Sequence, residues 1–89
     1  MVAEEEEVEV ATAAAHGTDE RIASLSPRLL GLLDLMAQGR DNAQIAAVLG
    51  LAEKTVRNHI TQLFDRLDVE GRAQAIVLAR ENGLGRRTS

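Results

Sequence analysis

Apolar residues recur at helical spacing in four separate stretches of the chain, and a glycine follows three of these stretches. The four stretches are residues 26–38, 41–49, 53–67 and 71–82. In the third stretch the apolar positions lie three or four residues apart, at Val56, Ile60, Leu63 and Leu67. Such spacing turns one side of each helix toward a shared core. The pattern therefore predicts an all-α fold, a four-helix bundle.

Residues at the ends of these stretches indicate where the helices begin and end. Ser26 followed by Pro27 is a typical helix start, and Asp41 with Gln44 three residues later resembles a capping box. Gly50 can take the positive φ that a tight turn between two helices needs. The helices on either side of Gly50 are therefore predicted to form a central helix-turn-helix, whose second helix enters the major groove of DNA.

The polar face of helix 53–67 carries the side chains that would meet DNA. Lys54, Asn58 and Thr61 lie opposite the apolar stripe, and Arg57 flanks them. Cationic side chains can bind phosphate or guanine acceptors, and Asn can bind adenine. The alternative is that they are ordinary solvated residues. Asp65 shares this face about three turns after Lys54, beyond the first turns that usually make base contacts.

The net charge first argues against DNA binding, because the chain holds 14 acidic residues against 10 basic ones. Its distribution removes the objection. Residues 1–24 hold seven acidic residues against Arg21 alone, whereas residues 25–89 hold nine basic and seven acidic residues. We therefore expect an acidic, largely disordered tail or linker at 1–24, a helical domain at 25–84 and a frayed C-terminus at 85–89. The run Glu4 to Glu7 is either simply solvated or competes with phosphate for the basic face.

Composition excludes several other classes of function. The chain has no cysteine, and His16 and His59 are too far apart for the spacing of a metal site. No catalytic triad or phosphate-cradling glycine loop is present, so we expect neither an enzyme nor a bound cofactor. No apolar run reaches membrane-spanning length and the start is acidic, which predicts a cytoplasmic protein.

Several segments together resemble a known family. They are LSPR (25–28), AQG (37–39), Asn42, QIA (44–46), LGL (49–51), EKTVRNHI (53–60), RLDV (66–69), Arg72 and AQAIVLA (73–79). Over about residues 25–84 the chain resembles the LuxR/FixJ/GerE-type DNA-binding domain of bacterial transcription regulators. A bare helix-turn-helix would also fit region four of a bacterial sigma factor, but the EKTVRNHI segment followed by RAQA is far more specific.

The resemblance implies roles for individual residues. The DNA-binding positions it implies, together with two neighbours that we add, are Asn42, Lys54, Thr55, Val56, Arg57, Asn58, His59 and Thr61. Lys54, Arg57 and Asn58 would face bases and nearby phosphates, and Thr55 and His59 would contact the backbone. Val56 would lie at the boundary of helix and groove. The fourth helix would form a homodimer contact, expected at Ala73, Ile76, Val77 and Arg80.

The chain departs from the family pattern at three positions. Acidic residues are usual where Leu29 and Gly31 stand, which predicts an unusually apolar outer surface on the first helix. Asp41 replaces the usual Ser and caps equally well. Ala52 replaces a capping Ser or Thr, so helix 53–67 lacks a side-chain cap, at a cost of roughly 0.5–2 kcal/mol.

Some assignments stay open at this point. His59 either touches phosphate or is a half-buried packing residue bonded to a carbonyl. Arg72 is expected to pair with Asp68 or Glu70. Leu29 and Leu30 belong either to a fully packed core or to a patch for a partner.

Two functions follow from these alternatives. The first is a dimeric regulator of transcription that binds double-stranded DNA, acting alone or as the effector part of a longer regulator with a signalling domain. The second is a helix-turn-helix scaffold that binds a partner protein through its first or fourth helix.

Overall fold

The computed structural model describes residues 19–85, which form five α-helices and no strand. The helices are α2 (Glu20–Ala23), α3 (Pro27–Ala37), α4 (Asn42–Leu49), α5 (Glu53–Leu67) and α6 (Arg72–Glu81). The all-α prediction and its four helices are confirmed, and α2 is added to them. The expectations for the acidic run and for the last four residues lie outside the described part of the chain.

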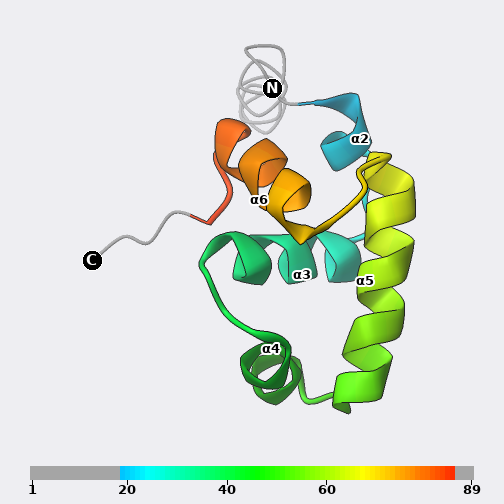
Figure 1. The fold of residues 1–89 in the computed structure, drawn as a ribbon, viewed down its shortest axis with the longest axis vertical. Helices are drawn as coiled ribbons and strands as arrows, with labels where there is room; N and C mark the ends of the chain where they lie inside the picture. The colour runs from blue at the N-terminus through cyan, green and yellow to red at the C-terminus, as the bar shows by residue number, and fades with distance from the viewer. Residues whose placement is uncertain (1–18, 86–89) are drawn as a thin grey trace, which may run out of the picture.

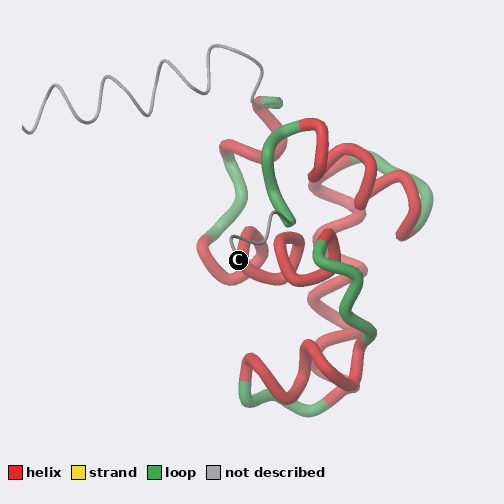
Figure 2. The backbone as a smooth tube through the Cα atoms, turned by 90° about the vertical axis from the view of Figure 1, so that its left-hand side faces the viewer, coloured by secondary structure: helices red, strands yellow, loops and turns green. Residues whose placement is uncertain are grey.

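The longest helix, α5, runs along one side of the molecule, and the other helices are arranged beside it (Figure 1). Helix α3 lies across its middle and packs closely with α6, whereas α4 lies beside the first turns of α5 (Figure 2). The first part of α5 therefore projects with α4 at one end of the molecule. Helix α2 lies at the other end, near the last turn of α5.

The helix ends follow the predicted local chemistry. Ser26 Oγ accepts the Leu29 N–H at 3.2 Å, which caps α3. At α4, Asp41 Oδ1 accepts the Gln44 N–H at 2.8 Å while Gln44 Oε1 accepts the Asp41 N–H at 2.9 Å, so the capping box is complete. Gly50 ends α4 with a φ of 70°, a conformation that glycine adopts without steric cost. These features fix the turn between α4 and α5.

The core is built from aliphatic side chains of all five helices. The largest fully buried side chains are Leu32, Leu33, Met36, Ile45, Val56, Leu63 and Leu67. Leu29 is buried too, at 5% exposed, and Leu30 packs partly buried against the same cluster. The predicted apolar outer surface on the first helix is therefore wrong, because Leu29 faces inward. The hypothesis that a partner protein binds through the first helix therefore loses its support. If the domain binds a partner protein, α6 is the predicted helix that remains for this contact.

Residues 19–24 form part of the fold, although the sequence interpretation assigned them to the tail. Ile22 of α2 is 4% exposed and joins the core. The Arg21 guanidinium donates to the Leu67 carbonyl at the end of α5, and the Asp19 N–H donates to Asn82 Oδ1 beyond α6. The start of the described chain is thus tied to the ends of two other helices.

The last described residues fold back over α3. The Leu84 N–H donates to the Ala79 carbonyl at 2.9 Å, which closes the end of α6 around Gly83, a residue with positive φ. The Gly85 N–H then donates to Asp34 Oδ1 at 2.7 Å. A Cβ on Gly85 would lie 2.5 Å from the Cβ of Ala37, so only glycine fits this contact without a shift. Together, residues 19–24 and 82–85 are called the terminal clasp below.

Candidate nucleic-acid interface

Helix α5 separates its apolar and polar residues cleanly onto two sides. Its buried residues are Val56, Ile60, Leu63 and Leu67. Lys54, Arg57, Asn58 and Thr61 are all exposed, and together they are called the reading face. Because the helix start projects beside α4, the first turns of α5 present this face to solvent at one end of the molecule.

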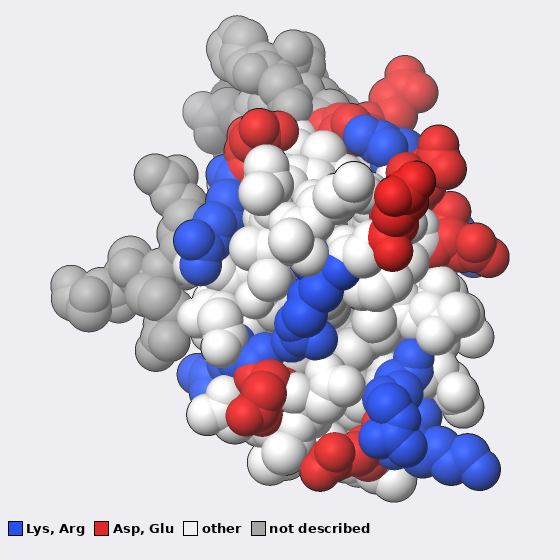
Figure 3. All heavy atoms as spheres, viewed as in Figure 1, with Lys and Arg blue, Asp and Glu red and all other residues white. Residues whose placement is uncertain are grey.

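The two cations of the reading face are not neutralised by the protein. Within residues 19–85 the one ion pair joins Arg21 to Asp19, at 2.8 Å, so Lys54 and Arg57 have no carboxylate partner there. Figure 3 shows basic groups predominating over the part of α5 next to α4, with acidic groups gathered toward its opposite end. The local field is therefore positive where the reading face lies, although the whole chain is acidic.

Thr61 makes a hydrogen bond within its own helix. Its hydroxyl donates to the Arg57 carbonyl at 3.1 Å, so the proton is already used while the oxygen can still accept. Lys54, Arg57 and Asn58 have no such contact among the described residues. They are the members of the face whose donors are all available to a ligand.

The positions flanking the reading face differ in exposure. Thr55 and His59 are half-buried. His59 Nδ1 is buried without a hydrogen-bond partner in the described structure, so the predicted bond to a carbonyl is not made by that atom. Val56 is fully buried, which confirms its core position. A side chain with no exposed surface cannot touch a base, so we do not retain Val56 as a contact.

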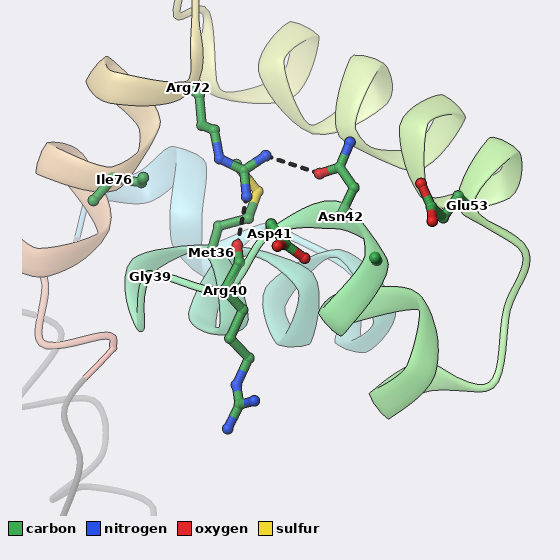
Figure 4. A pocket seen from close by; sticks show the side chains of 9 residues that line it. Met36, Gly39, Arg40, Asp41, Asn42, Glu53, Arg72 and Ile76 are labelled. Atoms are coloured by element: carbon green, nitrogen blue, oxygen red, sulfur yellow. Dashed lines mark hydrogen bonds between the residues drawn. The ribbon is translucent and has the colours of Figure 1, made fainter.

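A contact that sequence reasoning missed lies at the start of α4. Arg72 Nη1 donates to Asn42 Oδ1 at 2.9 Å, and Nη2 donates to the Arg40 carbonyl at 2.7 Å (Figure 4). The expected pairing of Arg72 with Asp68 or Glu70 is wrong, because its guanidinium points to α4 instead. A hollow of about 550 Å³ lies beside the contact, lined in part by Asp41 and Glu53.

The residues predicted to form the homodimer contact lie on α6. Ala73 and Val77 are exposed, and Val77, at 56%, is one of two large apolar side chains with much exposed surface in the described residues. They line a mostly apolar hollow of about 360 Å³. Ile76 is half-buried against the core, and Arg80 donates twice to the Ala37 carbonyl, at 2.9 and 2.7 Å. The exposed apolar part of the predicted set is therefore Ala73 and Val77, while Arg80 is exposed but bonded to the protein.

Among residues 19–85, the Asp19–Arg21 pair is the one place where the protein shifts pKa values clearly. Hydrogen bonds from the Arg21 side chain and backbone lower the pKa of the Asp19 carboxyl to about 2. The same side-chain bond raises the pKa of Arg21. This pair lies in the terminal clasp, away from the reading face, and so belongs to the structure of the domain.

This arrangement, a short helix followed by a glycine turn and a projecting polar helix, defines a helix-turn-helix DNA-binding domain. Residues 23–79 match the family of bacterial regulatory proteins called the luxR family. The match covers more than half of the chain, which therefore belongs to that family. The resemblance recognised in the sequence is confirmed.

Individual relatives support the same assignment. The chain is 44% identical over 61 residues to the transcriptional regulatory protein LiaR of Bacillus subtilis (strain 168), covering 68% of this chain and 29% of LiaR. It is 48% identical over 50 residues to the DNA-binding transcriptional activator DevR/DosR of Mycobacterium tuberculosis (strain ATCC 25618 / H37Rv), covering 56% of this chain and 23% of the relative. It is 42% identical over 53 residues to the spore germination protein GerE of Bacillus subtilis (strain 168), covering 60% of this chain and 72% of GerE.

These relatives differ in how much of their length the chain matches. It spans less than a third of LiaR and of DevR/DosR, but most of GerE. LiaR and DevR/DosR are named as regulators of transcription and not as enzymes. Among residues 19–85, no helix combines the length and apolar character needed to cross a membrane.

Proposed function

We propose that this chain regulates transcription in the bacterial cytoplasm by inserting the first half of α5 into the major groove of double-stranded DNA. The observation that carries the proposal is the reading face itself. Lys54, Arg57 and Asn58 are exposed opposite a buried apolar stripe, and the described part of the protein gives them no partner. Unpaired donors on a projecting helix suit base edges and phosphate oxygens.

Each side chain of the reading face has a role that fits its chemistry. Arg57 can donate two parallel hydrogen bonds to guanine, and Asn58 can both donate to and accept from adenine. Lys54 adds a mobile positive charge beside a phosphate. Thr55, His59 and the amide of Asn42, all half-buried, would contact the backbone of the duplex. Thr61 serves as an acceptor, because its proton is already donated.

We further propose that two chains bind together through α6. Ala73 and Val77 supply an exposed apolar surface on that helix, and two-fold pairing would present two reading faces to successive half-sites. Arg80 is not part of this contact, since its guanidinium is held by the Ala37 carbonyl. Val77 is the side chain whose burial would gain most on pairing.

The proposal is tested by selecting duplexes from a random pool with the 89-residue chain and with a chain that starts at Asp19. A start at Leu25 is unsuitable, because it removes the buried Ile22. We expect both chains to enrich one sequence with two-fold symmetry, and binding to weaken steeply with salt, by about 0.9 log units per phosphate neutralised for each log unit of salt. Tighter binding by the shorter chain would show that the acidic segment competes with DNA.

Failure to enrich any sequence, or affinity that does not change with salt, would overturn the proposal. An enriched site without symmetry would leave DNA binding in place and remove the dimer.

A further inference from the structure

Arg72 connects α6 to the first turn of α4 by two hydrogen bonds. Its guanidinium reaches the side-chain oxygen of Asn42 and the backbone oxygen of Arg40, which are respectively 30 and 32 residues earlier in the chain. Both side chains of the Arg72–Asn42 pair are half-buried. Because two acceptors in different directions hold a planar group, the guanidinium has a fixed orientation.

A fixed guanidinium also fixes the Asn42 amide. The amide has an oxygen that accepts and an NH₂ group that donates, while a guanidinium has donors only. Arg72 can therefore bind only the oxygen, which turns the NH₂ group to the other side. Figure 4 shows Asn42 Nδ2 pointing away from Arg72, and this atom donates to no group in residues 19–85.

We propose that Arg72 is a positioning residue, which holds the Asn42 NH₂ group outward so that it donates to a DNA phosphate oxygen. The inference rests on the proposed function, because α4 meets a phosphate only if α5 lies in the groove. A phosphate oxygen accepts hydrogen bonds and never donates them. The reverse orientation of the amide would set oxygen against oxygen, so the contact depends on Arg72 and not on Asn42 alone.

Charge in the neighbourhood does not explain a phosphate contact by itself. The hollow beside the pair is lined by the cations Arg40 and Arg72 and by the acidic side chains of Asp41 and Glu53. Opposite charges of equal number cancel at a distance. A neutral donor with a fixed direction is then the group that recognises the phosphate oxygen.

Asn42→Asp tests the inference with almost no change of shape. Aspartate keeps an oxygen for Arg72 but replaces the outward NH₂ group with a second oxygen. Gln44→Glu is the matched control, because it adds the same charge in the same turn of α4 and can still accept the Asp41 N–H. The readouts are the Kd of the 89-residue chain for a mixed-sequence duplex, by fluorescence anisotropy, and the midpoint of thermal unfolding.

We expect Asn42→Asp to bind the duplex roughly tenfold more weakly than Gln44→Glu, as for loss of a hydrogen bond to a charged group. Its unfolding midpoint should equal or exceed that of the wild type, because aspartate would pair with Arg72. A purely structural Asn42 would instead give the two variants equal affinity, and that result would overturn the inference. Duplex binding by the wild type, lost on Arg57→Ala, would show that the proposed function stands even then.

The role of Arg72 is tested by a double-mutant cycle. Asn42→Ala should weaken binding in the wild-type background and cause little further loss in an Arg72→Met background, because the amide is no longer oriented there. If the losses of binding free energy caused by Asn42→Ala and by Arg72→Met are additive in the double variant, a positioning role for Arg72 is contradicted. If Arg72→Met does not fold, the comparison of Asn42→Asp with Gln44→Glu decides the question. A wild-type chain that binds no duplex would overturn both this inference and the proposed function.

Discussion

The reading face and the terminal clasp are both polar surfaces of the same small domain, yet their side chains are used in opposite ways. In the clasp, Arg21 is bonded to Asp19 and to the Leu67 carbonyl, and Asn82 is bonded to the Asp19 N–H and the Leu78 carbonyl. On the reading face, Lys54 and Arg57 have no partner among the described residues. The clasp uses its donors in bonds within the protein, whereas Lys54, Arg57 and Asn58 of the reading face keep theirs available to a ligand.

This difference separates structural from functional cations more sharply than net charge does. Of the arginines that the structure describes, three are held by backbone carbonyls: Arg21, Arg72 and Arg80. Counting all basic residues would treat them as equal to Arg57. A cation that is exposed and has no bond within the protein keeps all of its donors available for phosphate, whereas these three arginines have already used one or more.

The largest effect is expected when the clasp is opened at Ile22. Ile22→Ala removes a side chain that is 4% exposed, which should lower the free energy of unfolding by about 2–5 kcal/mol. Chemical denaturation measures the loss. Ala23→Ser, at an exposed site in the same short helix, is the control and should change stability little. Equal stability of the two variants would show that α2 is not part of the folded core.

The missing cap of α5 gives a second, smaller effect at the reading end. Ala52 has extended backbone angles suited to a capping residue but makes no side-chain bond. Ala52→Ser should raise the free energy of unfolding by about 0.5–2 kcal/mol. Gly71→Ser is the matched change at α6, which also lacks a side-chain cap, and should gain only a few tenths, since Gly is already a fair cap. A larger gain at Gly71 would contradict the view that the start of α5 is the weaker helix end.

The smallest effect concerns the dependence of the clasp on pH. The pKa of Asp19 is lowered to about 2 in the folded chain from its ordinary 3.8, so folding favours the ionised carboxyl. This contribution is complete above pH 4 or so and is lost as the pH falls through about 2. The free energies of unfolding of the wild type and of Asp19→Asn, measured by chemical denaturation between about pH 2 and pH 4, should differ most near pH 4 and converge near pH 2. A constant difference would mean that the ion pair does not stabilise the clasp.

Local chemistry explains how much of the fold could be predicted from the sequence. The capping box of Asp41 and Gln44 and the turn at Gly50 depend on neighbours within a few residues. The stripe from Val56 to Leu67 depends only on helical spacing, and so it was also predictable.

Long-range contacts explain the rest. Helix α2 has one buried residue, so its sequence shows no apolar repeat. It is held by the bond from Arg21 to Leu67, 46 positions later in the chain, and by the bond from its capping residue Asp19 to Asn82, 63 positions later. Arg72 was assigned to carboxylates nearby in sequence, but the fold brings Asn42 to it instead. The reading face was predictable as a face of a helix. Which of its donors are already used, as in Thr61, required the structure.

The most direct test compares two arginines of α5 in binding to the selected duplex over a range of salt concentrations. Both are exposed, but Arg57 lies on the reading face and Arg66 in the last turn of the helix. We predict that Arg57→Ala weakens binding roughly tenfold or more and reduces the log–log salt slope by about one, while Arg66→Ala leaves both near the wild-type values. Equal effects of the two substitutions, or a larger effect of Arg66→Ala, would contradict the assignment of DNA reading to the first half of α5.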